Sequence, residues 1–147
     1  MLRLSTQVVT VWLLRIMGFM ICMAVGPIFF PRSWMEAIAV GLGLGEPPAL
    51  PLFYYLARSC SAMYFAHGCF ILLTSTNVIR YRSFVFLIAG LNLFLGSILL
   101  VIDWWAPMPW YWTCLEGPPI LGVGIILVYL ARRLPKLDTT LTECNGE

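Results

Sequence analysis

The chain has 147 residues, of which 61% are hydrophobic and 11% are charged. An ordinary soluble domain carries about 25% charged residues, so a water-soluble fold of this size has too little polar surface to cover its apolar side chains. The net charge of +2, without a dense basic run, argues against nucleic acid as a partner. The single histidine, His67, excludes a multi-histidine metal site or a bis-histidine haem site within one chain.

Four apolar stretches approach the roughly 20 helical residues that cross a bilayer core about 30 Å thick. They cover residues 8–30, 50–76, 83–102 and 118–134, and a short tail follows at 135–147. Pro118 and Pro119 suit the first turn of the last helix, where a missing N–H costs nothing. The start of the chain faintly resembles a cleaved signal peptide, but Arg15 interrupts it and the apolar run continues to Phe30, which favours a retained span. The sequence predicts one all-α domain, an integral membrane four-helix bundle.

Two connections between these spans have unusual compositions. Residues 34–46 are apolar and glycine-rich but too short to cross, so we expect an interfacial or shallow re-entrant segment between the first two spans. Aromatic residues crowd the connection before the last span: Trp104, Trp105, Trp110, Tyr111 and Trp112. Such rings are typical of the membrane interface, and an aromatic ligand-binding lid is the alternative.

The distribution of basic residues predicts the orientation of the spans. In a four-span arrangement one side carries Arg32 alone, whereas the other carries Arg3, Arg80, Arg82, Arg132, Arg133 and Lys136. The richer side is therefore predicted to be cytoplasmic, with both termini inside and the protein in the inner (cytoplasmic) membrane. The outer side then holds the carboxylates Glu36, Glu46, Asp103 and Glu116.

Ionisable residues inside a span are costly, so each one is a candidate for a functional site. Arg58 lies about two turns below the outer end of the second span, the side that carries Asp103 and Glu116. It is a candidate anchor for an anionic lipid or a carboxylate ligand. The alternative is an ion pair with Asp103 or Glu116 that fixes helix packing.

Three further polar residues lie deeper in the predicted spans. Arg15 can extend to the cytoplasmic headgroups or pair with Asn92 or His67. His67 is expected to form an interhelical hydrogen bond, with a proton relay as the alternative. On the third span a polar and small stripe predicts the face that packs against other helices: Ala89, Asn92, Gly96, Leu99 and Asp103.

The sequence offers no catalytic constellation. Its five cysteines, Cys22, Cys60, Cys69, Cys114 and Cys144, form no C-x-x-C pair. Cys60 and His67 share a helix face but stand about 10 Å apart, too far for the base to activate the thiol. Cys114 and Cys144 fall on opposite sides of the membrane and are predicted to form no disulfide.

Several short segments carry a resemblance to a known family. They are Tyr55-Leu56-Ala57-Arg58-Ser59, Met63-Tyr64, His67-Gly68, Arg80-Tyr81-Arg82 and Glu116-Gly117-Pro118-Pro119. In this pattern, over residues 8–134, the chain resembles a group of bacterial four-span membrane proteins that are DoxX-like in pattern. The resemblance implies a four-span fold, and some DoxX-like relatives belong to thiol or quinone redox complexes. It assigns no catalytic residue to this chain.

These features favour a non-enzymatic membrane protein over an enzyme. We expect an accessory or structural subunit for a partner membrane protein, or a binder of a small ligand such as an anionic lipid or quinone. A small transporter is the second hypothesis, although no inverted repeat is visible. A membrane enzyme that uses Arg58, Asp103 and Glu116 at the outer face is the third.

Overall fold

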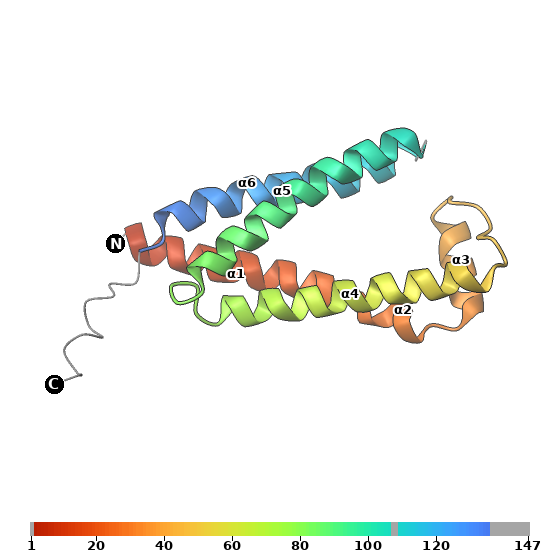
Figure 1. Ribbon diagram of the computed structural model, residues 1–147, viewed down its shortest axis with the longest axis horizontal. Coiled ribbons are helices and arrows are strands. Elements are labelled where there is room, and N and C mark those ends of the chain that lie inside the picture. The colour runs from red at the N-terminus through yellow and green to blue at the C-terminus, as the bar shows by residue number, and fades with distance from the viewer. Residues whose placement is uncertain (1, 107–108, 136–147) are drawn as a thin grey trace. The chain divides into compact units, whose positions relative to one another are not determined.

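The computed structural model describes residues 2–106 and 109–135, and within these ranges the regular structure is entirely helical. Figure 1 shows the order of the helices, which are α1 (Leu2–Cys22), α2 (Val25–Phe29), α3 (Arg32–Gly41), α4 (Pro51–Ser75), α5 (Arg82–Trp105) and α6 (Trp110–Arg133). The predicted all-α class is confirmed. Lys136 and Cys144, used above to predict orientation and thiol pairing, lie outside the described residues.

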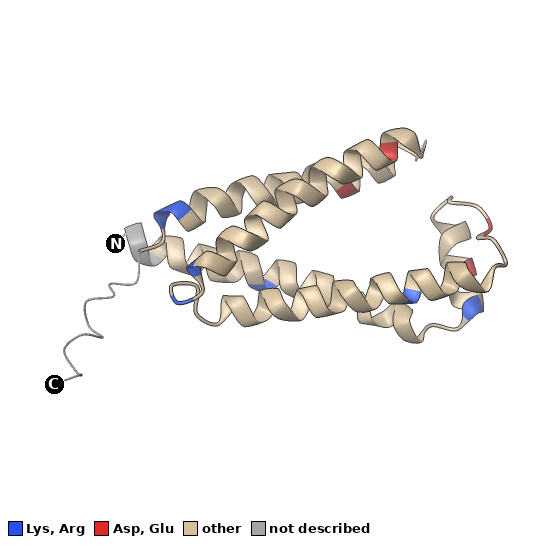
Figure 2. Cartoon of the chain, viewed as in Figure 1, with Lys and Arg blue, Asp and Glu red and all other residues tan. Residues whose placement is uncertain are grey.

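Four helical segments are long and apolar enough to cross a membrane. They cover Ser5–Phe29, Pro51–Ser75, Arg82–Trp105 and Trp110–Arg133. Each has 24 or 25 residues, or about 36 Å of helix. At most 28% of the residues in any span are buried within the chain, so most of their apolar surface requires lipid or another protein. The chain is a multi-pass membrane protein. Most of the length of each helix carries no charge (Figure 2).

The chain divides into two compact units. One comprises residues 14–73, and the other comprises residues 1–13 together with 74–147. The boundaries fall inside α1 and α4, and each unit is described by itself below. The arrangement of all four spans as one bundle remains a prediction.

The first predicted span is interrupted. α1 ends at Cys22, a turn at Met23 and Ala24 follows, and α2 then begins at Val25. The expected interfacial segment after it is in part a helix, because α3 takes up its first half. Irregular chain follows, where Gly43 and Gly45 have φ angles of 72° and 80°. A side chain is strained in that region of backbone space, which explains glycine at these two positions.

The fourth span begins earlier than predicted. α6 starts at Trp110, so Pro118 and Pro119 lie inside the helix and not in its first turn. Because proline has no N–H, the carbonyls of Cys114 and Leu115 lose their usual helical donors. Membrane helices tolerate such interruptions where neighbouring groups or local adjustment satisfy the freed carbonyls. The prediction was wrong because a proline pair marks a helix start reliably only where the helix cannot continue upstream.

α5 and α6 pack through glycines that receive leucines from the opposite helix. A Cβ at Gly96 would lie 2.7 Å from Leu121 Cγ, and one at Gly117 would lie 2.7 Å from Leu100 Cγ. Gly124 receives Leu93 in the same way, with 3.0 Å to its backbone nitrogen. Small residues let membrane helices approach closely and gain van der Waals contact. Four members of the predicted stripe on α5 are buried, namely Ala89, Asn92, Gly96 and Asp103, whereas Leu99 is half-buried.

α1 and α4 also cross at glycines that contact the opposite helix closely. Cβ atoms added at Gly18 and Gly68 would lie 2.9 Å from Leu72 Cγ and 2.8 Å from the backbone nitrogen of Cys22, respectively. Gly18 against Leu72 and Gly68 against Cys22 fix an antiparallel register between the two helices. In this register Arg15 lies at the level of the last turn of α4.

Candidate ligand groove

Arg58 lies on α4 at the end near α2 and α3. Its Nη2 donates a hydrogen bond to the carbonyl oxygen of Phe30 at 3.2 Å, and its side chain is exposed. A guanidinium has five N–H donors. Within the described chain the carbonyl of Phe30 is the acceptor that Arg58 binds, so most of its donor capacity and its full charge remain open to a ligand.

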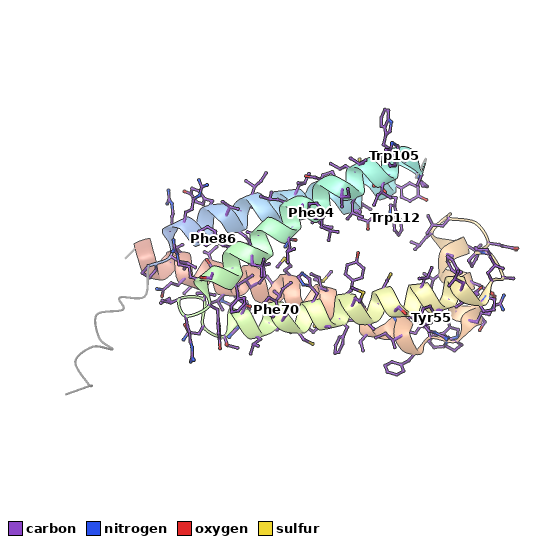
Figure 3. All side chains as sticks on the ribbon, in the orientation of Figure 1. Tyr55, Phe70, Phe86, Phe94, Trp105 and Trp112 are labelled. Carbon is purple, nitrogen blue, oxygen red and sulfur yellow. The ribbon has the colours of Figure 1, made fainter. Side chains whose placement is uncertain are left out.

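A groove of about 510 Å³ opens beside Arg58. It is lined by Arg32, Pro51, Tyr54, Tyr55, Arg58, Ser59 and Ala62. Tyr55 marks this part of α4 in Figure 3. Residues 51, 54, 55, 58, 59 and 62 follow helical spacing and form one face of α4, and Arg32 comes from the first turn of α3. The groove therefore combines two guanidinium groups with hydroxyl and ring surfaces.

The second arginine of the groove is already neutralised. Arg32 Nε donates to Glu36 Oε1 at 2.8 Å, and the Tyr54 hydroxyl donates to the same oxygen at 2.7 Å. The Arg32 guanidinium also lies over the Tyr54 ring, 4.6 Å from its centroid. Hydrogen bonds from Tyr54 and then from Arg32 hold the pKa of the Glu36 carboxyl below its usual value. Glu36 therefore stays ionised and forms a salt bridge with Arg32.

The charge balance of the groove follows from these contacts. Glu36 cancels the charge of Arg32, whereas Arg58 binds a neutral carbonyl, so the groove keeps about one positive charge. A second hollow, of about 620 Å³, is lined by Arg32 together with Glu36 and Glu46. Two carboxylates disfavour an anion there. An anionic group is thus expected beside Arg58.

Two other predicted site residues, Asn92 and His67, do not line the groove. Asn92 is buried, and its Nδ2 donates to the Ile88 carbonyl of its own helix at 2.8 Å, so it does not depend on a partner helix. His67 is half-buried on α4. In the described chain His67 has no hydrogen-bond partner, and the expected interhelical bond stays a prediction.

The two carboxylates predicted on the outer side, Asp103 and Glu116, differ in their contacts. Glu116 accepts a hydrogen bond from the Trp112 indole nitrogen at 2.6 Å, one turn earlier on α6. Asp103 is only 6% exposed, and its Oδ2 has no hydrogen-bond partner among the described residues. Both belong to the second unit, whereas Arg58 belongs to the first. The predicted ion pair of Arg58 with either carboxylate therefore stays a prediction.

Sequence reasoning missed the polar cluster of Arg32, Glu36 and Tyr54. It assigned Arg32 and Glu36 to an outer connection and gave Tyr54 no role. The signal was the four-residue spacing of Arg32 and Glu36, which suits a salt bridge along a helix and indicated that the connection begins as a helix. It also missed the approach of Cys22 and Cys69, because their separation of 47 residues carries no motif.

Comparisons with known proteins identify no family for this chain. No protein-family model, no curated protein and no solved structure matches the chain. The resemblance to DoxX-like proteins stays a prediction. Among the described residues, no group of three or more His, Cys, Asp or Glu side chains is arranged to hold a metal ion.

Proposed function

We propose that this chain is a non-enzymatic membrane protein that binds an anionic amphiphile through its phosphate group in the groove beside Arg58. The observation that carries the proposal is the Arg58 guanidinium, which faces a groove of about 510 Å³ and binds only a neutral carbonyl within the described chain. Ligand pockets commonly measure about 300–1,000 Å³, so the groove has room for a headgroup.

The chemistry of the lining favours a phosphate over a carboxylate. A guanidinium fork forms paired, charge-assisted hydrogen bonds with carboxylate and phosphate oxygens alike, but a phosphate has further acceptor oxygens for additional donors. Tyr55 and Ser59 line the same groove, and each carries a hydroxyl that can donate a further hydrogen bond. Pro51 and Ala62 supply apolar surface for the part of a lipid next to its headgroup. The groove begins at Pro51, the first residue of a span. The end of a span lies at the depth of the lipid phosphates.

The proposal includes a topology. Both termini lie in the cytoplasm and the protein resides in the inner membrane, as the basic residues favour. The groove then faces the outer leaflet, because it lies at the end of α4 away from Arg80 and Arg82. Reporter fusions at Met1 and Glu147 test this, and an external signal from either end would overturn the assignment.

The direct test compares lipid binding by two matched variants. The purified protein is exchanged into nanodiscs of phosphatidylcholine with a small fraction of phosphatidylglycerol, and bound anionic lipid is quantified. Arg58→Ala should weaken binding roughly 10- to 100-fold, because a charged hydrogen bond contributes about 1.5–3 kcal/mol. Arg80→Ala removes the same charge from an exposed position outside the groove and should leave binding unchanged.

Competition with inorganic phosphate distinguishes a lipid from free phosphate as the ligand. Inorganic phosphate at millimolar concentration should compete only weakly if a lipid tail contributes, and fully if the ligand is free phosphate. Equal lipid binding by Arg58→Ala and wild-type protein would contradict the proposal.

A further inference from the structure

Two cysteines from distant parts of the chain meet where α1 and α4 cross. The sulfur atoms of Cys22 and Cys69 lie 3.9 Å apart, and both thiols are free. The Cys22 sulfur also lies 3.9 Å from the Phe65 carbonyl oxygen, one helical turn before Cys69. Both residues belong to the unit of residues 14–73.

The backbones at this crossing are close enough for a covalent bridge. Gly68, next to Cys69, has no side chain, and a Cβ there would lie 2.7 Å from the Cys22 sulfur and 2.8 Å from the Cys22 nitrogen. A disulfide needs a sulfur separation of about 2.05 Å and a Cα separation of about 4.4–6.8 Å. The sulfurs lie 3.9 Å apart, so a bridge requires them to approach by about 2 Å.

The environment of the pair determines which oxidant can reach it. Cys22 and Cys69 lie inside the segments Ser5–Phe29 and Pro51–Ser75, both of which are apolar enough to cross a membrane. Cys69 is exposed on the surface of its helix, whereas Cys22 is half-buried. A thiol at this depth of a bilayer lies in the hydrocarbon region, so an oxidant that reaches it must dissolve there.

We infer that Cys22 and Cys69 form an oxidation site, a dithiol that lipid-soluble hydroperoxides convert into a disulfide between α1 and α4. The Cys69 sulfur attacks the peroxide oxygen, the O–O bond breaks, and an alcohol leaves with one proton. The resulting sulfenic acid on Cys69 is then attacked by the Cys22 sulfur, which forms the S–S bond and releases water. Two thiols and one hydroperoxide give one disulfide, one alcohol and one water.

The disulfide would lie next to the turn that separates α1 from α2. Cys22 is the last residue of α1, and α2, Phe30 and α3 follow within ten residues. A disulfide at this point fastens the end of α1 to α4 just before the segment whose Phe30 carbonyl binds Arg58. The oxidised form therefore restrains the connection that leads to the groove.

The test uses the full chain in phosphatidylcholine nanodiscs with one protein per disc. Cumene hydroperoxide is added, free thiols are alkylated after denaturation, and peptide mapping identifies linked cysteines. We expect a Cys22–Cys69 peptide that disappears on reduction. Linked groups have effective concentrations in the millimolar range, so this pairing should be roughly 10³-fold faster than any intermolecular pairing at micromolar protein.

Single substitutions make the assignment specific. Cys69→Ser should abolish the bridge, and Cys22→Ser should leave Cys69 as a sulfenic acid that a dimedone probe captures. Cys60→Ser is the matched control, because Cys60 is an exposed thiol on the same helix, and it should keep the bridge. Full alkylation of Cys22 and Cys69 in denatured wild-type protein, after treatment of the folded protein with the hydroperoxide, would overturn the inference. A disulfide to Cys60 that forms at a similar rate would also overturn the inference.

Discussion

The helix pairs α5–α6 and α1–α4 both pack closely at glycines, but they differ at their ends. In α5–α6 three glycines each receive a leucine from the partner helix. This pair ends in a connection flanked by Trp104, Trp105 and Trp110, each at least 78% exposed, and Figure 3 shows Trp105 projecting away from α5. In α1–α4 the close contact lies at one crossing, and beyond it α1 stops and the groove beside Arg58 opens.

The difference shows how one chain combines tight packing with an accessible site. Glycine contacts along a whole pair leave no room for a ligand, and α5–α6 follows that pattern. α1–α4 confines its glycine contacts to Gly18 and Gly68, so the far end of α4 can pair with α3, which carries Arg32 and Glu36. The three predictions below test this comparison.

The largest effect on stability is expected from Gly68→Ala. Its new Cβ would meet two backbone atoms closer than 3.0 Å, the Cys22 nitrogen and the Gly18 oxygen, and backbone cannot yield as a side chain can. Overpacking of this kind costs about 1–3 kcal/mol. Gly96→Ala, with one backbone atom at 2.9 Å, should cost less, and Gly117→Ala, which meets mainly the Leu100 side chain, should cost least.

Thermal denaturation in detergent measures this series, and Gly90→Ala is its control. Gly90 lies on α5 with nothing within 4 Å of its added Cβ, so the change should be neutral or slightly stabilising, as Ala exceeds Gly in helix propensity by about 1 kcal/mol. A Gly68→Ala variant as stable as Gly90→Ala would show that α1 and α4 do not cross as described.

A smaller effect is expected from Asp103→Asn. The buried Oδ2 has no hydrogen-bond partner among the described residues, so removal of the charge should leave stability unchanged or raise it by about 1 kcal/mol. Combined with Arg58→Ala, it should give an additive double-mutant cycle, with a coupling energy below about 0.5 kcal/mol. A larger coupling energy would establish the structural ion pair and weaken the ligand interpretation of Arg58.

The smallest effect concerns the pH dependence of the α3–α4 contact. Because the pKa of Glu36 is lowered in the folded protein, its carboxylate stabilises the contact above the pKa of an unfolded glutamate, about 4.3. That contribution is lost as the pH falls through the lower folded pKa. Hydrogen exchange of the α3 amides should be insensitive to pH near neutrality, after correction for intrinsic rates, and should accelerate on acidification.

Glu36→Gln provides the matched control for the titration. The amide oxygen can still accept from Tyr54, but it cannot titrate, so the acid-dependent acceleration should disappear. The same acceleration in Glu36→Gln would assign the effect to another group.

The span count and the buried face of α5 could be predicted from the sequence, because both depend on local periodicity and hydropathy. Ala89, Asn92, Gly96 and Asp103 share a helical face, and all are buried. The end of the first span and the start of the last could not be predicted. Composition does not mark the turn at Met23, and Pro118 gives the same signal at a helix start as inside a helix.

The candidate site was predictable only in its central residue. Arg58 stands out because charge is rare inside an apolar stretch. Its surroundings depend on tertiary contacts, since the Phe30 carbonyl is 28 residues away and Tyr54 is 18 residues from Glu36. The Cys22–Cys69 contact depends in the same way on the register set by Gly18 and Gly68.

Native mass spectrometry of the gently solubilised protein tests the central claim most directly. The account predicts a retained anionic phospholipid on the wild-type protein and on Arg80→Ala, and its loss from Arg58→Ala without unfolding. A stoichiometric partner chain with no bound lipid would contradict the account and favour an accessory subunit. A retained quinone, or unchanged lipid on Arg58→Ala, would also contradict it.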